Sequence, residues 1–152
     1  MLFILALFAV FMISALFIVL FGARIYKKIV ADSDTNYNAR TSIAYISEKI
    51  RQHDSDNGVD VLEDGAEPIL RLRDTYGGMD YYTYLYELDG NLMEITTPAD
   101  YDPVYTAGQA ILKVSSFNVE KQSDALYRFD ITDEYGNEVD FYITAYSRTE
   151  NL

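Results

Sequence analysis

The stretch that decides the fold is LFILALFAVFMISALFIVLF, residues 2–21. Ser14 is its one polar residue, and a helical serine can bond back to a carbonyl of the preceding turn. About 20 helical residues span roughly 30 Å, the thickness of the hydrocarbon core of a bilayer. We therefore expect residues 1–22 to form a single transmembrane helix whose first partner is the lipid bilayer.

A cleaved signal peptide is the alternative for this segment. Such peptides usually have an apolar core of roughly 7–15 residues and a small-x-small cleavage site. The apolar run is longer here, and Gly22-Ala23-Arg24 is a poor cleavage site. The sequence therefore favours a retained signal anchor.

The charges outside the apolar run are unevenly spread along the 152 residues. Residues 23–52 carry 6 basic and 3 acidic side chains, net +3, and residues 53–152 carry 6 basic and 21 acidic ones, net −15. The net charge of −12 argues against nucleic acid as a partner, because the acidic region repels phosphate. The chain has no cysteine, which excludes disulfides and thiolate chemistry, and its single histidine leaves little for a catalytic triad.

Residues 23–52 continue the helical pattern after the apolar run. Their apolar residues recur at spacings of three and four, most clearly at Ala39, Ile43, Ile46 and Ile50. Fewer than three clean heptads are present, so we expect an amphipathic stalk helix that packs on a sheet rather than a coiled coil. The polar run Asp32–Asn38 favours helix ends and predicts a kink or a melted turn.

From His53 onward the sequence period changes to two, the period of β-strands. Residues 81–88 place Tyr82, Tyr84 and Tyr86 on one face, and Asp89-Gly90 separates them from a second strand at 92–96. A strand, Asp-Gly and another strand predict a hairpin.

Further strands are expected at 69–73, at 117–120, at 126–132 and in a last strand with Val139, Phe141, Ile143 and Ala145 on its inner face. Residues 107–114 fit a helical turn and a strand equally well. The predicted fold is therefore α+β: a transmembrane helix, 1–22, continues as an amphipathic helix, 23–52, which packs on the small antiparallel sheet of an acidic head, 53–152.

This order of parts resembles type IV pilins and the minor pseudopilins of secretion and DNA-uptake machines. RTSIAYISEKIR, residues 40–51, is similar to the segment where a pseudopilin stalk enters its head, and YLYELDGNL, residues 84–92, is similar to the head hairpin. The chain most closely resembles small single-pass proteins gathered in a family of domains of unknown function. The resemblance implies an extracytoplasmic head and other pilin-like subunits as partners through the apolar helix.

The chain also departs from the pilin pattern. Pilin precursors carry a basic leader, a glycine before the cleavage site and a glutamate at the fifth mature position, whereas Leu5 is the fifth residue here and residues 1–22 contain no acid. Because Met1 lies directly at the apolar run, a start upstream with a basic leader stays open as an alternative.

The orientation of the helix leaves two function hypotheses open. The first is a non-enzymatic, pilin-like component of a cell-envelope apparatus at the cell membrane, with its head outside the cytoplasm. The second is an anchored sensor, ligand-binding domain or enzyme with a cytoplasmic head, which Arg24, Lys27 and Lys28 favour through the positive-inside rule.

The acidic residues of the head predict no specific site. Asp54–Asp60 offers carboxylates at alternate positions, but Gly58, Val59 and Gly65 stand where an EF-hand loop needs Asn or Asp, Gly and Glu, so we expect a solvated turn rather than a calcium site. Glu63-Asp64 and Asp100 with Asp102 are weak candidates for glycosidase acids.

Four other features of the sequence are also interpreted as structural rather than functional. We expect His53 to end the stalk helix, Ser42 to have no nucleophilic role, and Gly77-Gly78 to lie outside any phosphate loop. Most of the 14 tyrosines are expected in the core, with an exposed binding face as the alternative. The sequence thus predicts no catalytic, cofactor or metal residues and no small-molecule substrate.

Overall fold

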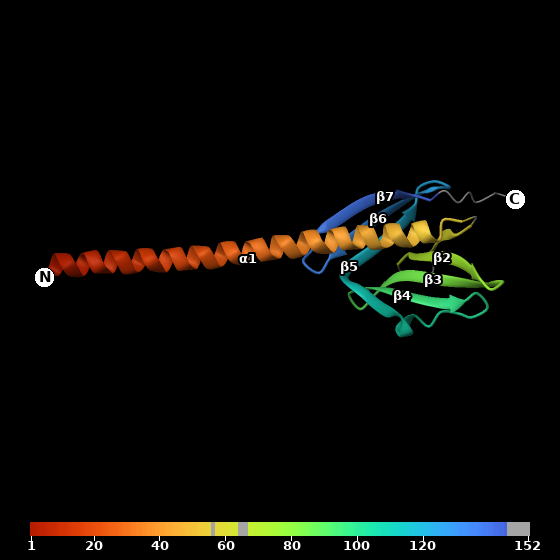
Figure 1. The fold of residues 1–152 in the computed structure, drawn as a ribbon, viewed down its shortest axis with the longest axis horizontal. Coiled ribbons are helices and arrows are strands. Elements are labelled where there is room, and N and C mark those ends of the chain that lie inside the picture. The colour runs from red at the N-terminus through yellow and green to blue at the C-terminus, as the bar shows by residue number, and fades with distance from the viewer. Residues whose placement is uncertain (56, 64–66, 146–152) are drawn as a thin grey trace. The chain divides into compact units, whose positions relative to one another are not determined.

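The computed structural model describes residues 1–55, 57–63 and 67–145, with the side chains of residues 30–39 excepted. It has an α+β fold, as the sequence predicts, with one long helix followed by an antiparallel sheet (Figure 1). The chain divides into two compact units, Met1–Tyr37 and Asn38–Leu152, and the helix α1 (Leu2–Gln52) contributes to both.

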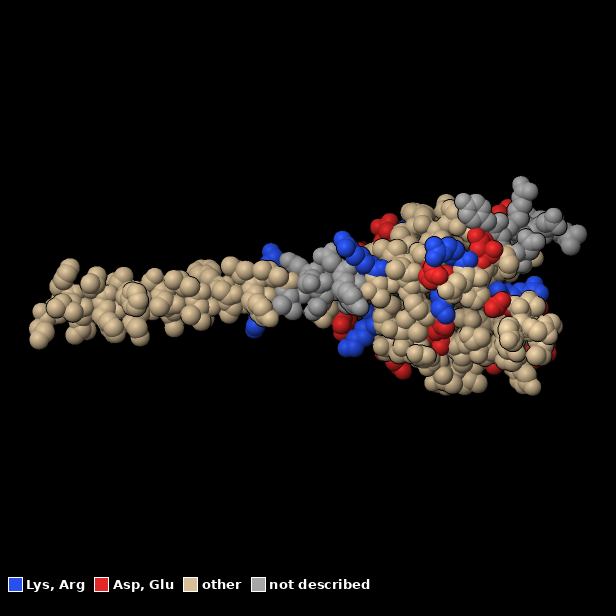
Figure 2. Space-filling view, viewed as in Figure 1, with Lys and Arg blue, Asp and Glu red and all other residues tan. Residues whose placement is uncertain are grey.

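The first unit contains the apolar part of α1. Leu2–Ile29 is long and apolar enough to cross a membrane, with a mean hydropathy of 3.0, and none of its most apolar window is buried. Figure 2 shows an uncharged surface over most of this segment and basic side chains (blue) toward its end, where the sequence has Arg24, Lys27 and Lys28. The helical assignment continues through Asp32–Asn38, so the melted turn expected there is not found.

In the second unit, seven strands of the described residues form one sheet in the order β1 to β7. Each strand pairs antiparallel with the next along the chain. The strands are β1 (Val59–Leu62), β2 (Ile69–Tyr76), β3 (Met79–Leu88), β4 (Asn91–Pro98), β5 (Gln109–Lys121), β6 (Leu126–Asp133) and β7 (Glu138–Thr144).

The last turns of α1 fill one face of this sheet (Figure 1). Ile46 and Ile50 are 0% and 2% exposed, and they join a core with residues of β1 to β6 such as Leu70, Leu85 and Phe129. The predicted helical stripe is thus confirmed at these two positions. Because a 3.6-residue period also brings position 42 to this face, Ser42 is buried there at 3% exposure.

The other face of β2–β4 carries a second, aromatic cluster. Ile69, Tyr84 and Tyr86 are buried in it, while Leu85 between the two tyrosines faces α1, as the predicted alternation requires. A short 3-10 helix, η1 (Tyr105–Ala107), covers this cluster, and the Tyr86 hydroxyl donates a hydrogen bond to the Tyr105 carbonyl. The tyrosines of β3 therefore belong mainly to a core.

The predicted hairpin at Asp89-Gly90 is confirmed. Both residues have positive φ, 51° and 75°, as a two-residue turn between twisted strands needs, and Leu88 pairs with Asn91. Glycine adopts this backbone without strain, which explains its place in the turn.

Residues 107–121 differ from the prediction, which left 107–114 open between a helical turn and a strand and placed a short strand at 117–120. After η1, all residues from Gln109 to Lys121 form the single strand β5. Its pairing with β6 shifts register between Val114 and Ser116, which leaves both Ser115 and Ser116 exposed between the buried Val114 and Phe117. An extra residue of this kind breaks the period of two, so the alternation does not identify one continuous strand.

Candidate functional site

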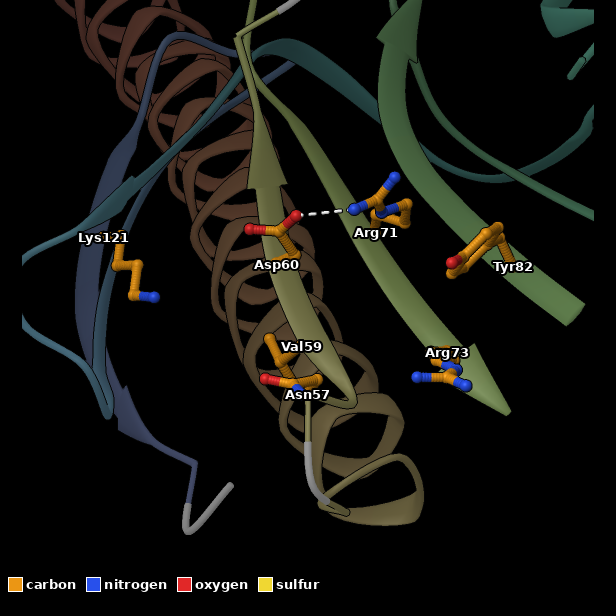
Figure 3. A pocket seen from close by; sticks show the side chains of 7 residues that line it. All are labelled: Asn57, Val59, Asp60, Arg71, Arg73, Tyr82 and Lys121. Atoms are coloured by element: carbon orange, nitrogen blue, oxygen red, sulfur yellow. Dashed lines mark hydrogen bonds and ion pairs between the residues drawn. The ribbon is translucent and has the colours of Figure 1, made fainter. Parts of the chain in front are cut away.

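The acidic head gathers half of its basic side chains around one pocket. Arg71, Arg73 and Lys121 are three of the six basic residues in the region 53–152. They line a cavity of about 250 Å³ together with Asn57, Val59, Asp60 and Tyr82 (Figure 3). We call these seven residues the basic pocket.

Strand alternation and pairing position the basic pocket. Arg71 and Arg73 lie two residues apart on β2, so both point to the face opposite α1. Asp60 of β1 pairs directly with Arg71, and Tyr82 of β3 pairs directly with Arg73. Figure 3 shows Lys121, from the end of β5, on the opposite side of β1 from Arg71 and Tyr82.

Each arginine of the pocket is held by a carboxylate. Arg71 Nη2 lies 2.7 Å from Asp60 Oδ2, and its guanidinium carbon lies 4.7 Å from the centre of the Tyr82 ring, a cation–π distance. Arg73 Nη2 lies 2.6 Å from Asp80 Oδ2. The Nε atoms of Arg71 and Arg73 are buried and have no hydrogen-bond partner within the described part of the chain.

Asp80 holds Arg73 from the edge of the pocket. Thr75 donates a hydrogen bond to Asp80 Oδ1, and this bond and the one from Arg73 lower the pKa of Asp80. The same partner raises the pKa of Arg73, so this pair stays ionised. The ion pair with Asp80 orients the guanidinium of Arg73, whose side chain is 37% exposed.

A third arginine provides a comparison. Arg128 of β6 also pairs with a carboxylate, Asp130, at 2.9 Å, and it too has a buried Nε without a partner among the described residues. Its surroundings are acidic, however, since Glu138 and Asp140 line the adjacent cavity. The basic pocket is therefore set apart by its charge and not by the Arg–Asp pairing alone.

The described acidic residues of the predicted loop, Asp54 and Asp60, have structural surroundings. Asp60 pairs with Arg71, and Asp54 lies beside the end of α1 in a cavity lined by Ile50 and Arg51. Asp56 and Asp64 fall outside the described residues. Within residues 1–55, 57–63 and 67–145, no three His, Asp or Glu side chains come close enough together to hold a metal ion.

The other residues singled out in the sequence occupy structural positions. His53 follows the last turn of α1, where its Nδ1 lies 2.7 Å from the Lys49 carbonyl oxygen, so the expected helix-end role is confirmed. Glu63, Asp100 and Asp102 are exposed. Gly77 and Gly78 form the turn between β2 and β3, with φ of 62° and 81°.

Sequence reasoning missed the basic pocket. The alternation of residues 69–73 does place Arg71 and Arg73 on one face, and that was a usable signal. Lys121 joins them only because the sheet brings β5 near β1 and β2, which the pattern along one strand cannot reveal.

Comparison with known proteins identifies the family to which the head belongs. No curated protein and no solved structure matches the chain. The model of the family described as Domain of unknown function (DUF4860) matches residues 37–134, which is more than half of the chain and runs from the stalk part of α1 to β6. The chain therefore belongs to the DUF4860 family, as its resemblance to a family of domains of unknown function led us to expect.

Proposed function

We propose that the protein is a non-enzymatic, pilin-like membrane protein that serves as a structural or assembly component of a cell-envelope apparatus. The observation that carries the proposal is that α1 contains both a segment suited to a membrane and a segment that packs in the core of the head. Its segment Leu2–Ile29 is apolar and exposed, whereas Ile46 and Ile50 of the same helix are core residues of the head.

The exposed segment explains why we propose a membrane and helical partners. Large apolar side chains such as Phe3, Phe8 and Phe11 are 62–79% exposed, and water disfavours so much contiguous apolar surface. A bilayer satisfies this surface, and within lipid the same side chains can pack against the helices of neighbouring subunits. The partners of this proposal are therefore lipid and other pilin-like subunits.

The head is built on the C-terminal turns of the same helix. Separating α1 from the sheet would expose Ile46 and Ile50, which together with their core partners make the head a body built around the helix. A folded head that is covalently continuous with a membrane helix suits a protein that links others at the membrane. We place the head outside the cytoplasm, in line with the resemblance to pseudopilins.

The alternative is an anchored sensor or enzyme with a cytoplasmic head. Arg24, Lys27 and Lys28, which follow the apolar run, favour this orientation. It differs from our proposal in the side of the membrane on which the head lies, and labelling of the head in intact cells separates the two.

Site-specific cross-linking in native membranes tests the assembly role. A photo-reactive phenylalanine analogue replaces Phe11, which is 69% exposed, and a matched analogue replaces Tyr142, which is 56% exposed on the head. We expect the Phe11 position to yield adducts with single-pass, pilin-like subunits or with a second copy. The proposal would be contradicted if Phe11 gave adducts with lipid alone and the protein isolated from native membranes were a monomer.

A further inference from the structure

We propose that the basic pocket of the head binds a carboxylate group. The inference concerns a ligand and stands apart from the assembly role proposed above. It rests on the charge of the pocket, on the donors that its arginines keep available and on the aromatic ring beside them.

The charge of the basic pocket is opposite to that of the head around it. Residues 53–152 carry a net charge of −15, yet the described residues that line the pocket include Arg71, Arg73 and Lys121 against the acid Asp60. With Asp80, the ion-pair partner of Arg73, also counted, three cations face two carboxylates and one net positive charge remains. In a head that repels anions overall, an anion meets local positive charge here. Focused charge in a concave site raises the local concentration of the opposite ion.

The two arginines keep hydrogen-bond donors for a ligand. A guanidinium has five N–H donors, and the pairing of Arg71 with Asp60 and of Arg73 with Asp80 employs one nitrogen of each. The buried Nε of each arginine has no acceptor among the described residues. These Nε atoms are closed to solvent, so a ligand would contact the terminal guanidinium nitrogens that the two ion pairs leave over, and a carboxylate matches the guanidinium fork in geometry and charge.

Two features of the pocket favour a carboxylate over a phosphate dianion. Asp60 lies within the lining, and its negative charge repels a phosphate dianion more strongly than it repels a carboxylate, which carries a single negative charge. The Tyr82 ring, with Arg71 packed on it, adds a flat apolar wall that suits a carboxylate attached to a ring or another apolar group. A cavity of about 250 Å³ has room for a group of that size.

The carboxylate can belong to a free small acid or to an acidic polymer, because both present the same group to the arginines. Benzoate is the probe for the first source and poly-L-glutamate for the second. Tighter binding of benzoate per carboxylate assigns the site to a small acid, whereas tighter binding of poly-L-glutamate assigns it to a polymer. Both results require that binding depends on the basic side chains of the pocket, Arg71 or Lys121.

Side-chain NMR of the full chain in detergent micelles tests the proposal. The Nε–Hε signals of Arg71 and Arg73 report on the pocket, and the signal of Arg128 is an internal control because its ion pair and buried Nε are similar while its surroundings are acidic. We expect benzoate to shift the two pocket signals saturably, with a Kd on the order of 1 mM, and to leave Arg128 unchanged. The neutral isostere benzamide should leave all three signals in place.

Matched variants separate binding from folding. Arg71→Gln and Lys121→Gln should each weaken benzoate binding about tenfold, and Arg128→Gln should leave it unchanged. Lys121 is exposed at the end of β5, so its variant keeps the test valid if Arg71→Gln unfolds the head. Shifts that grow linearly with benzoate, shifts of equal size at Arg128, or tighter binding of phenyl phosphate than of benzoate would overturn the proposal.

Discussion

The ammonium of Lys49 lies 2.7 Å from Oε1 of Glu94 and joins the last turns of α1 to strand β4. Tyr45, one turn earlier on the same helix, donates its hydroxyl proton to Oε2 of the same carboxylate. The side chains of Lys49 and Glu94 are only 23% and 18% exposed. Burial raises the pKa of Tyr45, and the hydrogen bond and charge of Glu94 raise it further, so the phenol stays protonated and keeps donating.

Replacing Glu94 tests this link between helix and sheet. We predict that Glu94→Ala destabilises the head by about 2–4 kcal/mol, because it leaves the half-buried ammonium of Lys49 and the hydroxyl of Tyr45 without their acceptor. Chemical denaturation of the full chain in micelles, followed by tyrosine fluorescence, measures the free energy of unfolding.

The exposed pair of Arg51 and Glu48 is the matched control on the same helix. These side chains are 77% and 47% exposed, so solvent screens their attraction. Arg51→Ala should change the free energy of unfolding by less than about 0.5 kcal/mol. Equal losses for the two variants would show that Glu94 does not hold α1 to the sheet.

Two isoleucines of α1 test whether the helix belongs to the core of the head. Ile46 is 0% exposed and Ile29 is 60% exposed. Ile46→Ala should cost about 2–5 kcal/mol through lost apolar contact and a cavity, and Ile29→Ala should leave the stability of the head unchanged. Thermal unfolding of the sheet, monitored by circular dichroism, compares them. A head that tolerates Ile46→Ala would contradict the packing of α1 on the sheet.

Most of the fold could be predicted because its elements follow local patterns. The apolar run of residues 2–21, the spacing of Ile46 and Ile50 and the turn at Asp89-Gly90 each have a short-range physical cause. Strand β5 could not be delimited, because the extra residue near Ser115 reverses which side chains face the core. The hydroxyl of Ser115 instead donates to the Asp133 carbonyl, 2.7 Å away on β6, a contact that only the pairing of the strands creates.

The basic pocket could not be predicted from the sequence either, because its residues come from strands that are far apart in the chain. Its cations come from β2 and from the end of β5, about 50 residues later in the chain. The curvature that brings these strands together is also marked by the Tyr127 hydroxyl, which donates to the carbonyl of Val59 on β1 at 2.9 Å. No periodicity within a single strand encodes such a contact.

The turn between β6 and β7 predicts a dependence of stability on pH. Asp133 is 7% exposed, and although burial alone raises its pKa, hydrogen bonds from Asn137 and Tyr135 outweigh that effect and lower the pKa below its usual value. Since the folded state has the lower pKa, this contribution is fully present above about pH 4 and is lost as the pH falls through the lowered value.

The variant Asp133→Asn removes that dependence. We predict a loss of about 1–2 kcal/mol at neutral pH, because the charged acceptor of the turn is gone, and a shallower decline of stability below about pH 4. Denaturant midpoints measured across acidic pH check both effects. Asp140→Asn, which removes an exposed carboxylate of β7, controls for the change in net charge. An unchanged slope in Asp133→Asn would refute the role given to this turn.

Gly58 directly precedes β1 and lies between Asn57 and Val59, which line the basic pocket. A Cβ at this position would lie 1.9 Å from the His53 carbonyl oxygen and 2.9 Å from that of Ser55. We predict that Gly58→Ala costs about 1–3 kcal/mol through this overlap. Gly22→Ala is the control, since nothing lies within 4 Å of its added methyl. Equal thermal stability of the two variants would contradict the close packing of the turn.

The most direct test of the account asks on which side of the membrane the head lies. The chain has no cysteine, so Tyr76→Cys introduces a single thiol at a side chain that is 77% exposed, near the turn between β2 and β3. A membrane-impermeant maleimide is applied to intact cells that express the full chain and, in parallel, to permeabilised cells. An extracytoplasmic head on a membrane-spanning α1 predicts equal labelling in both samples. Labelling only after permeabilisation would contradict it and would favour a cytoplasmic head behind Arg24, Lys27 and Lys28.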